Sequence, residues 1–77
     1  MFNKLVDIIC EYVEVDPENV KPESRFIEDL GFTSLDFMSM LGELADEFDV
    51  EIDQSKAVDI RTVQEAADYL ETLASEE

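Results

Sequence analysis

The chain has 77 residues, too few to divide into two separately packed cores, so we expect a single domain over residues 1–77. Five Lys and Arg against twenty-one Asp and Glu give a net charge of −16, which argues against binding to nucleic acid or to an anionic membrane surface. The same charge favours partner proteins that present basic surfaces.

Apolar residues recur at helical spacing from Phe2 to about Val13, and this pattern predicts the first helix. Asp16 before Pro17 is typical of a short helical turn that follows it. Pro22 makes a long helix across this stretch unfavourable.

The connection from Glu14 to Thr33 is long for a small domain, which indicates that it is ordered. We expect Phe26, Ile27 and Leu30 to hold it against the core. A connection of this length lets the first and second helices run in related directions, whereas a short loop would force them antiparallel.

The second helix is predicted from about Ser34 to Phe48. The residues expected on its core face are Phe37, Met40, Leu41, Leu44 and Phe48. A second face carries a small apolar strip beside acids, formed by Leu35, Met38, Gly42 and Ala45 with Ser39, Glu43, Asp46 and Asp49. Leu35 and Met38 either pack against the long loop or a short third helix, or belong to a docking surface for partners.

Two further helices are predicted after residue 49. Asp53 is placed to cap a short third helix from about Gln54 to Asp59. Thr62 and Glu65 have capping-box spacing and open the last helix, whose apolar stripe consists of Val63, Ala66, Ala67, Leu70 and Leu73. The segment 74–77 is expected to be a frayed acidic tail. The fold class is therefore all-α: a small four-helix bundle, three main helices plus one short helix, with a long ordered first loop.

The composition offers little for catalysis or metal binding. Cys10 is the only cysteine and there is no histidine, so we expect no disulfide, no zinc site and no thiol activated by a histidine base. A calcium-binding loop is also missing. Asp7 and Glu11 interrupt the N-terminal apolar run, so no signal-peptide pattern appears, and no run is long enough to cross a membrane. We expect a cytoplasmic protein without catalytic residues, metal or enzymatic activity of its own.

The stretch 29–36 joins a turn to the start of the second helix. Gly31 suits the turn, Thr33 suits the N-cap, and Asp36 lies at capping-box spacing, so Ser34 falls in the first helical turn. Unpaired N–H groups and the helix dipole there favour an anion, so a phosphodiester on Ser34 would be supported electrostatically. Serine is also common at helix starts as a simple cap, and the local pattern alone favours that second interpretation.

Over essentially its whole length the chain resembles the acyl carrier protein family. The resemblance rests on the segments 26–36, 47–52 and 60–66, with a serine at the start of an acidic helix. It implies a 4′-phosphopantetheine arm, donated by coenzyme A and joined through a phosphodiester to Ser34. The thiol of that arm would carry acyl groups as thioesters, in fatty acid synthesis or in a specialised polyketide or lipid pathway.

The resemblance also implies partners with basic docking surfaces: a phosphopantetheinyl transferase, and acyl ligase, ketosynthase or acyltransferase enzymes, which a monomeric carrier would visit. The contact set on the second helix would be Leu35, Asp36, Met38, Glu43, Asp46 and Glu47. An acyl chain would be sheltered in a cleft between helices, lined by residues such as Phe26, Leu41, Leu44 and Ile60.

Three positions depart from the family pattern. Thr33 stands where an Asp is usual, and Ser39 and Gly42 replace an acidic and a bulky apolar residue. These changes suggest a carrier with a dedicated pathway rather than general fatty acid synthesis. The alternatives are a peptidyl or D-alanyl carrier, or an unmodified acidic helical adaptor, which would keep its function after Ser34→Ala.

Overall fold

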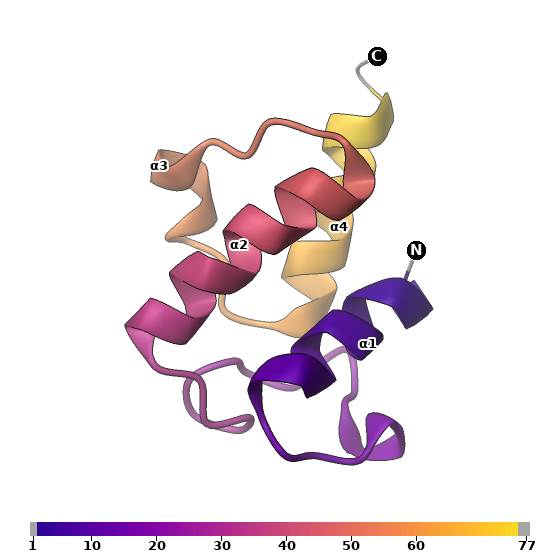
Figure 1. Ribbon diagram of the computed structural model, residues 1–77, viewed down its shortest axis with the longest axis vertical. Coiled ribbons are helices and arrows are strands. Elements are labelled where there is room, and N and C mark those ends of the chain that lie inside the picture. Colours follow the sequence, from indigo (N-terminus) through magenta and orange to yellow (C-terminus); the bar gives the residue numbers. More distant parts are fainter. Residues whose placement is uncertain (1, 76–77) are drawn as a thin grey trace.

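The computed structural model describes residues 2–75, and within them the chain is helical, which confirms the predicted fold class. The helices in order are α1 (Phe2–Tyr12), α2 (Ser34–Phe48), α3 (Gln54–Ala57) and α4 (Val63–Ser75) (Figure 1). A 3₁₀ turn, η1, occupies Pro17–Asn19 after Asp16, as the sequence predicts. The strand-like pairing in the described part of the chain is one isolated antiparallel bridge, between Arg25 and Thr62.

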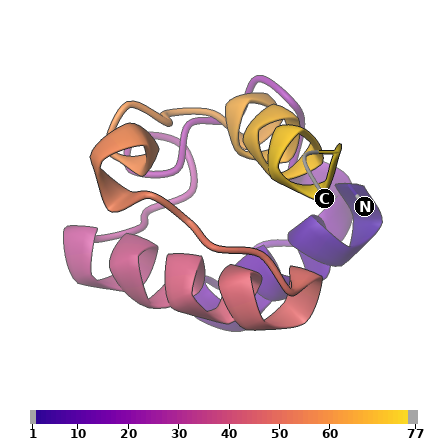
Figure 2. The same ribbon diagram turned by 90° about the horizontal axis from the view of Figure 1, so that it is seen from above.

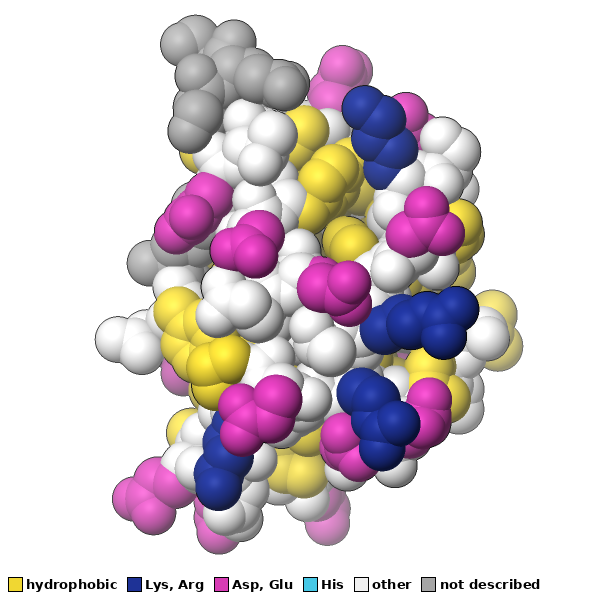
Figure 3. All heavy atoms as spheres, turned by 180° about the vertical axis from the view of Figure 1, so that it is seen from behind, with side chains coloured by type: hydrophobic (Ala, Val, Ile, Leu, Met, Phe, Trp, Pro, Cys, Tyr) yellow, Lys and Arg dark blue, Asp and Glu magenta, His cyan; other side chains and the backbone are white. Residues whose placement is uncertain are grey.

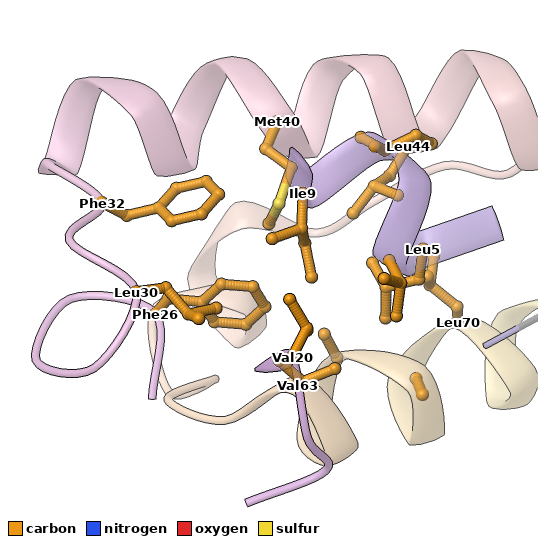
Figure 4. Packing of buried hydrophobic residues seen from close by; sticks show 14 residues of the cluster. Leu5, Ile9, Val20, Phe26, Leu30, Phe32, Met40, Leu44, Val63 and Leu70 are labelled. Atoms are coloured by element: carbon orange, nitrogen blue, oxygen red, sulfur yellow. The ribbon is translucent and has the colours of Figure 1, made fainter. Parts of the chain in front are cut away.

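The helices surround one core. Seen from above, α2 and α4 lie on opposite sides of the molecule, with α1 at one end and α3 at the other (Figure 2). The long helices and the loop between α1 and α2 all contribute buried side chains (Figure 4). The largest fully buried side chains are Leu5, Ile9, Phe26, Met40, Leu44, Val63 and Leu70. On α2 the predicted core face is therefore correct, with Phe37 and Phe48 half-buried at its ends.

The long loop is held to the core by Phe26 and Leu30, which are 1% and 8% exposed, as expected. Ile27 is 53% exposed, so its assignment to the core was wrong. The reason is a tight turn in which the N–H groups of Asp29 and Leu30 both donate to the Arg25 carbonyl, at 2.9 and 3.0 Å. This turn directs Phe26 and Leu30 inward and leaves Ile27 outside.

The expected direction of the first two helices was also wrong, because α1 and α2 run antiparallel (Figure 1). Lys4 near the start of α1 pairs with Glu47 near the end of α2, at 3.1 Å. Tyr12 at the end of α1 lies beside Phe32, just before α2, with ring centroids 5.9 Å apart. The long connection therefore joins two antiparallel helices, as a short loop would. Its extra length crosses the end of the bundle and adds side chains to the core.

Two helix ends differ from the prediction. Helix α3 begins after Asp53, whose carboxylate accepts the Ser55 N–H at 3.0 Å, but it stops at Ala57. It stops early because the N–H groups of Asp59 and Ile60 bond to the carbonyls three residues back, which tightens the chain out of the α-helix. Helix α4 continues to Ser75, so fraying from residue 74 was wrong, and residues 76–77 lie outside the described part.

Replacing Gly42 by alanine is expected to raise the free energy of unfolding by about 1 kcal/mol, because glycine costs that much relative to alanine inside a helix. A Cβ at Gly42 meets no atom within 4 Å, so nothing opposes the gain. Urea unfolding followed by circular dichroism measures the change.

Gly31→Ala is the contrasting variant, because Gly31 has φ +81°. An alanine held there should lower stability by about 1–2 kcal/mol. Equal effects of the two substitutions would contradict the assigned backbone geometry.

Candidate functional site

The start of α2 is fixed by a reciprocal pair of hydrogen bonds. The Asp36 N–H donates to Thr33 Oγ1 at 3.1 Å, and the Thr33 N–H donates to Asp36 Oδ2 at 3.2 Å. This is the predicted capping box, with Thr33 in extended conformation as the N-cap. It follows that Ser34 is the first helical residue and is not needed as the cap.

The turn before the cap is set by Gly31 and Phe32. Gly31 takes the left-handed conformation that only glycine adopts readily. The Phe32 N–H then donates to the Phe26 carbonyl at 2.9 Å, and the Phe32 ring is buried edge-on against Phe26 at a centroid distance of 5.4 Å. A buried aromatic residue two positions before Ser34 therefore anchors the start of the helix while Ser34 itself remains exposed.

The first N–H groups of α2 are available to a ligand. In residues 2–75 the N–H groups of Ser34 and Leu35 have no hydrogen-bond acceptor, and the Ser34 hydroxyl makes no hydrogen bond. Helix starts are electropositive, so an anion bonded to Ser34 would be stabilised there. A site with an exposed hydroxyl and two free N–H donors suits a covalently attached phosphate group.

The start of α4 provides a useful contrast. Thr62 and Glu65 form the predicted capping box, with the Glu65 N–H on Thr62 Oγ1 at 3.2 Å and the Thr62 N–H on Glu65 Oε1 at 3.0 Å. The next two donors are occupied by the long loop, because the Val63 and Gln64 N–H groups donate to the carbonyls of Ser24 and Pro22. No donor is left over at this second helix start.

A groove of about 430 Å³ opens beside Ser34. Its walls come from the turn after residue 24, the first turns of α2, and the connection between α3 and α4. The lining residues are Arg25, Phe26, Ile27, Glu28, Ser34, Phe37, Met38, Val58, Ile60 and Arg61. The volume lies within the range of small-molecule sites in proteins.

The predicted cleft matches this groove only in part. Phe26 and Ile60 line it as expected, whereas Leu41 and Leu44 do not; both are buried, and Leu44 belongs to the core cluster. Met38 lines the groove but remains 39% exposed, so both interpretations of this residue left open by the sequence stay open. The two arginines of the lining were missed, and only their position inside the segments 26–36 and 60–66, or next to them, could have indicated them.

The six α2 residues assigned to partner contacts do not all face the same way. Leu35 is 81% exposed and Asp46 is exposed, so both are free to meet another molecule. Glu43 accepts a hydrogen bond from the Tyr12 hydroxyl at 3.1 Å, and Glu47 pairs with Lys4 of α1. Asp36 is held in its capping box and Met38 lines the groove.

Electrostatics differ between the two sides of α2. In the turn before α2, hydrogen bonds from the side chain and backbone of Arg25, which lines the groove, hold the pKa of Asp29 below its usual range. The stability that Asp29 contributes is therefore present above its unfolded-state pKa and is lost as the pH falls through the lowered value. On the α1 side, the nearby charge of Glu43 raises the pKa of Glu11.

The described residues form neither a membrane span nor a metal site. In residues 2–75 no helix has the length and apolarity to cross a membrane. Within the same residues no group of three or more Cys, Asp and Glu side chains is arranged to hold a metal ion.

Comparison with known proteins gives one consistent result. The family model for a phosphopantetheine attachment site matches residues 3–70. The acyl carrier protein of Bdellovibrio bacteriovorus is 47% identical over 68 residues, covering 88% of this chain and 87% of the relative. That of Chlorobium phaeobacteroides is 46% identical over 67 residues, covering 87% and 86%. The solved acyl carrier protein of Enterococcus faecalis superposes with a TM-score of 0.82 at 30% identity, covering 94% and 91%.

Removing the Thr33 cap should destabilise the site. Thr33→Ala is expected to lower the free energy of unfolding by about 1 kcal/mol, because the Asp36 N–H loses its acceptor. Thr33→Asp retains an acceptor and should stay within a few tenths of a kcal/mol of the wild type. Thermal unfolding measures both, and a harmless Thr33→Ala would show that the cap does not define the helix start.

Proposed function

This chain belongs to the acyl carrier protein family, and from that premise we propose that Ser34 is the residue to which its 4′-phosphopantetheine arm is attached. The chain is a carrier and not an enzyme. Its arm supplies a thiol on which acyl groups are held as thioesters. The chain itself has to present that arm to enzymes that carry out the chemistry.

The proposal depends on one observation, the exposed and unbonded hydroxyl of Ser34 at the start of α2. The capping interpretation of this serine loses its support, because Thr33 already accepts the Asp36 N–H. The free N–H groups of Ser34 and Leu35 and the helix dipole favour a phosphodiester at the same point. The residues present therefore fit the group that the family implies.

Members of this family interact with enzymes of fatty acid synthesis and modification. As finer parts of the proposal, the chain acts as a monomeric single domain over residues 1–77 in the cytoplasm. Its partners are a phosphopantetheinyl transferase and acyl ligase, ketosynthase or acyltransferase enzymes with basic docking surfaces. The departures at Thr33, Ser39 and Gly42 favour a dedicated pathway over general fatty acid synthesis.

For partner contact we propose the outward side of α2 next to Ser34. Leu35 offers an apolar anchor directly beside the modified residue, since four-fifths of its surface is exposed. Asp46 adds an exposed charge further along the helix. Glu43 and Glu47 contribute negative charge to the same helix while they remain bonded to α1. Apolar contact gives affinity, and the acids steer basic enzymes toward the serine.

Ser34→Ala should abolish attachment of the arm, because no hydroxyl remains to form the phosphodiester. Intact-mass spectrometry after incubation with coenzyme A and a phosphopantetheinyl transferase measures it. The wild type should gain one phosphopantetheinyl group, and so should the control Ser39→Ala, which changes an exposed serine further along α2. A gain of mass by Ser34→Ala would move the site elsewhere.

Asp46→Lys should lower kcat/KM of the transferase by roughly threefold to tenfold at low salt, because a steering charge is reversed. Glu18→Lys changes the charge equally on η1, outside the proposed surface, and should have a smaller effect. The difference between the two variants should shrink as salt is added. Equal losses would indicate that only net charge matters and would contradict the assigned surface.

A further inference from the structure

The few cations of this acidic chain are unevenly placed. There are five Lys and Arg in the whole sequence, and the groove beside Ser34 is lined by Arg25 and Arg61. Figure 3 shows most Lys and Arg side chains of the rear face along its right side, next to hydrophobic side chains, and a further cation at the lower left. The groove therefore carries positive charge on a protein whose net charge is −16.

The two arginines have different surroundings. Arg25 is neutralised by its own turn, with ion pairs to Glu28 at 2.6 Å and to Asp29 at 3.2 Å. Arg61 has no ion pair and no side-chain hydrogen bond to residues 2–75. Its charge makes a minor contribution to lowering the pKa of Glu65. Arg61 is therefore the charged group of the groove that remains open to a ligand.

The backbone of Arg61 is nevertheless held firmly. Its carbonyl accepts the Phe26 N–H at 2.9 Å, and its own N–H donates to Glu65 Oε1 at the same distance. These bonds join the groove wall to the start of α4. A guanidinium on such a fixed backbone loses less freedom on binding an anion than one on a mobile segment.

The other walls of the groove are mainly apolar. Val58 is 67% exposed, Ile27 53% and Met38 39%, so all three present apolar surface without a partner. Ile60 lies in the chain directly before Arg61 and also lines the groove. An occupant that satisfies both kinds of wall is a hydrocarbon chain that bears an anion.

We propose that this groove selects acyl groups that carry a carboxylate away from the thioester, and that Arg61 binds that carboxylate. The inference rests on the proposed attachment at Ser34, which lines the same groove. A cargo tethered there reaches Arg61 at a high effective concentration, so a weak ion pair suffices. The phosphodiester itself is already provided for by the free N–H groups of Ser34 and Leu35, so it does not require Arg61.

The sign of a pKa shift distinguishes a bound carboxylate from a free one. A carboxylate attached to a protein of net charge −16 is repelled by its surroundings, which raises its pKa. A carboxylate paired with Arg61 is attracted locally, which lowers its pKa. The titration of the cargo therefore shifts in opposite directions for the two arrangements.

The test uses the full chain loaded at Ser34 with adipoyl-phosphopantetheine labelled with ¹³C at the terminal carboxyl, and intact mass verifies loading first. Carbon NMR then follows the carboxyl titration. Relative to Arg61→Gln, the wild type should show a pKa lower by about half a unit or more. Arg61→Lys, which keeps the charge, should retain part of the shift.

Lys56→Gln is the matched control, because it removes one positive charge in α3, from a residue that does not line the groove. It should titrate like the wild type. A hexanoyl-loaded sample provides a second comparison. The methyl signals of Met38, Val58 and Ile60 should shift more on loading adipoyl than on loading hexanoyl.

Three results would overturn the inference. One is identical titration in the wild type and Arg61→Gln, and another is an equal methyl response to the two cargoes. The third is a full response of the Arg61 side-chain signals to attachment of the arm alone, which would assign Arg61 to the phosphodiester. Failure of the wild type to gain mass at Ser34 would instead refute the proposed function, on which the inference rests.

Discussion

Three backbone hydrogen bonds join the long loop between α1 and α2 to the start of α4, and the shape of the groove depends on them. The Phe26 N–H donates to the Arg61 carbonyl, and the Val63 and Gln64 N–H groups donate to the carbonyls of Ser24 and Pro22, all at 2.9–3.0 Å. The bonds from Val63 and Gln64 satisfy helix-end donors of α4 that would otherwise need water. All three bonds also fix the two walls between which the groove opens, and they anchor the turn that leads to Ser34.

This arrangement divides the work at the start of α2 between neighbouring residues. Phe32 packs in the core and Thr33 caps the helix. The Ser34 hydroxyl makes no hydrogen bond within residues 2–75 and is exposed. An exposed hydroxyl at such a point can be modified without loss of a structural bond. The helix dipole and the free N–H groups then favour a phosphate there without any cationic side chain.

Some of the acidic side chains that make up the negative charge crowd together on the helices. Glu11 lies close enough to Glu43 for the pKa of Glu11 to be raised, whereas the ion pair of Lys4 with Glu47 is exposed and contributes little. Such crowding lowers the free energy of unfolding of a small core. The same acids create a long-range negative field, which the proposed docking of basic enzymes requires, while the groove beside Ser34 contains a cation, Arg61.

The sequence by itself determined the local structure. Cap residues and apolar periodicity placed α2 at Ser34–Phe48 and the start of α4 at Val63, because hydrogen bonds within a few residues and one buried stripe decide these features. The whole-chain resemblance pointed to the family that the comparisons then showed. The tertiary structure decided what depends on segments far apart in the chain. It left Ile27 exposed, made α1 antiparallel to α2, and brought Arg61 to the groove beside Ser34. These features depend on packing and hydrogen bonds between distant segments, which leave no periodic pattern in the sequence.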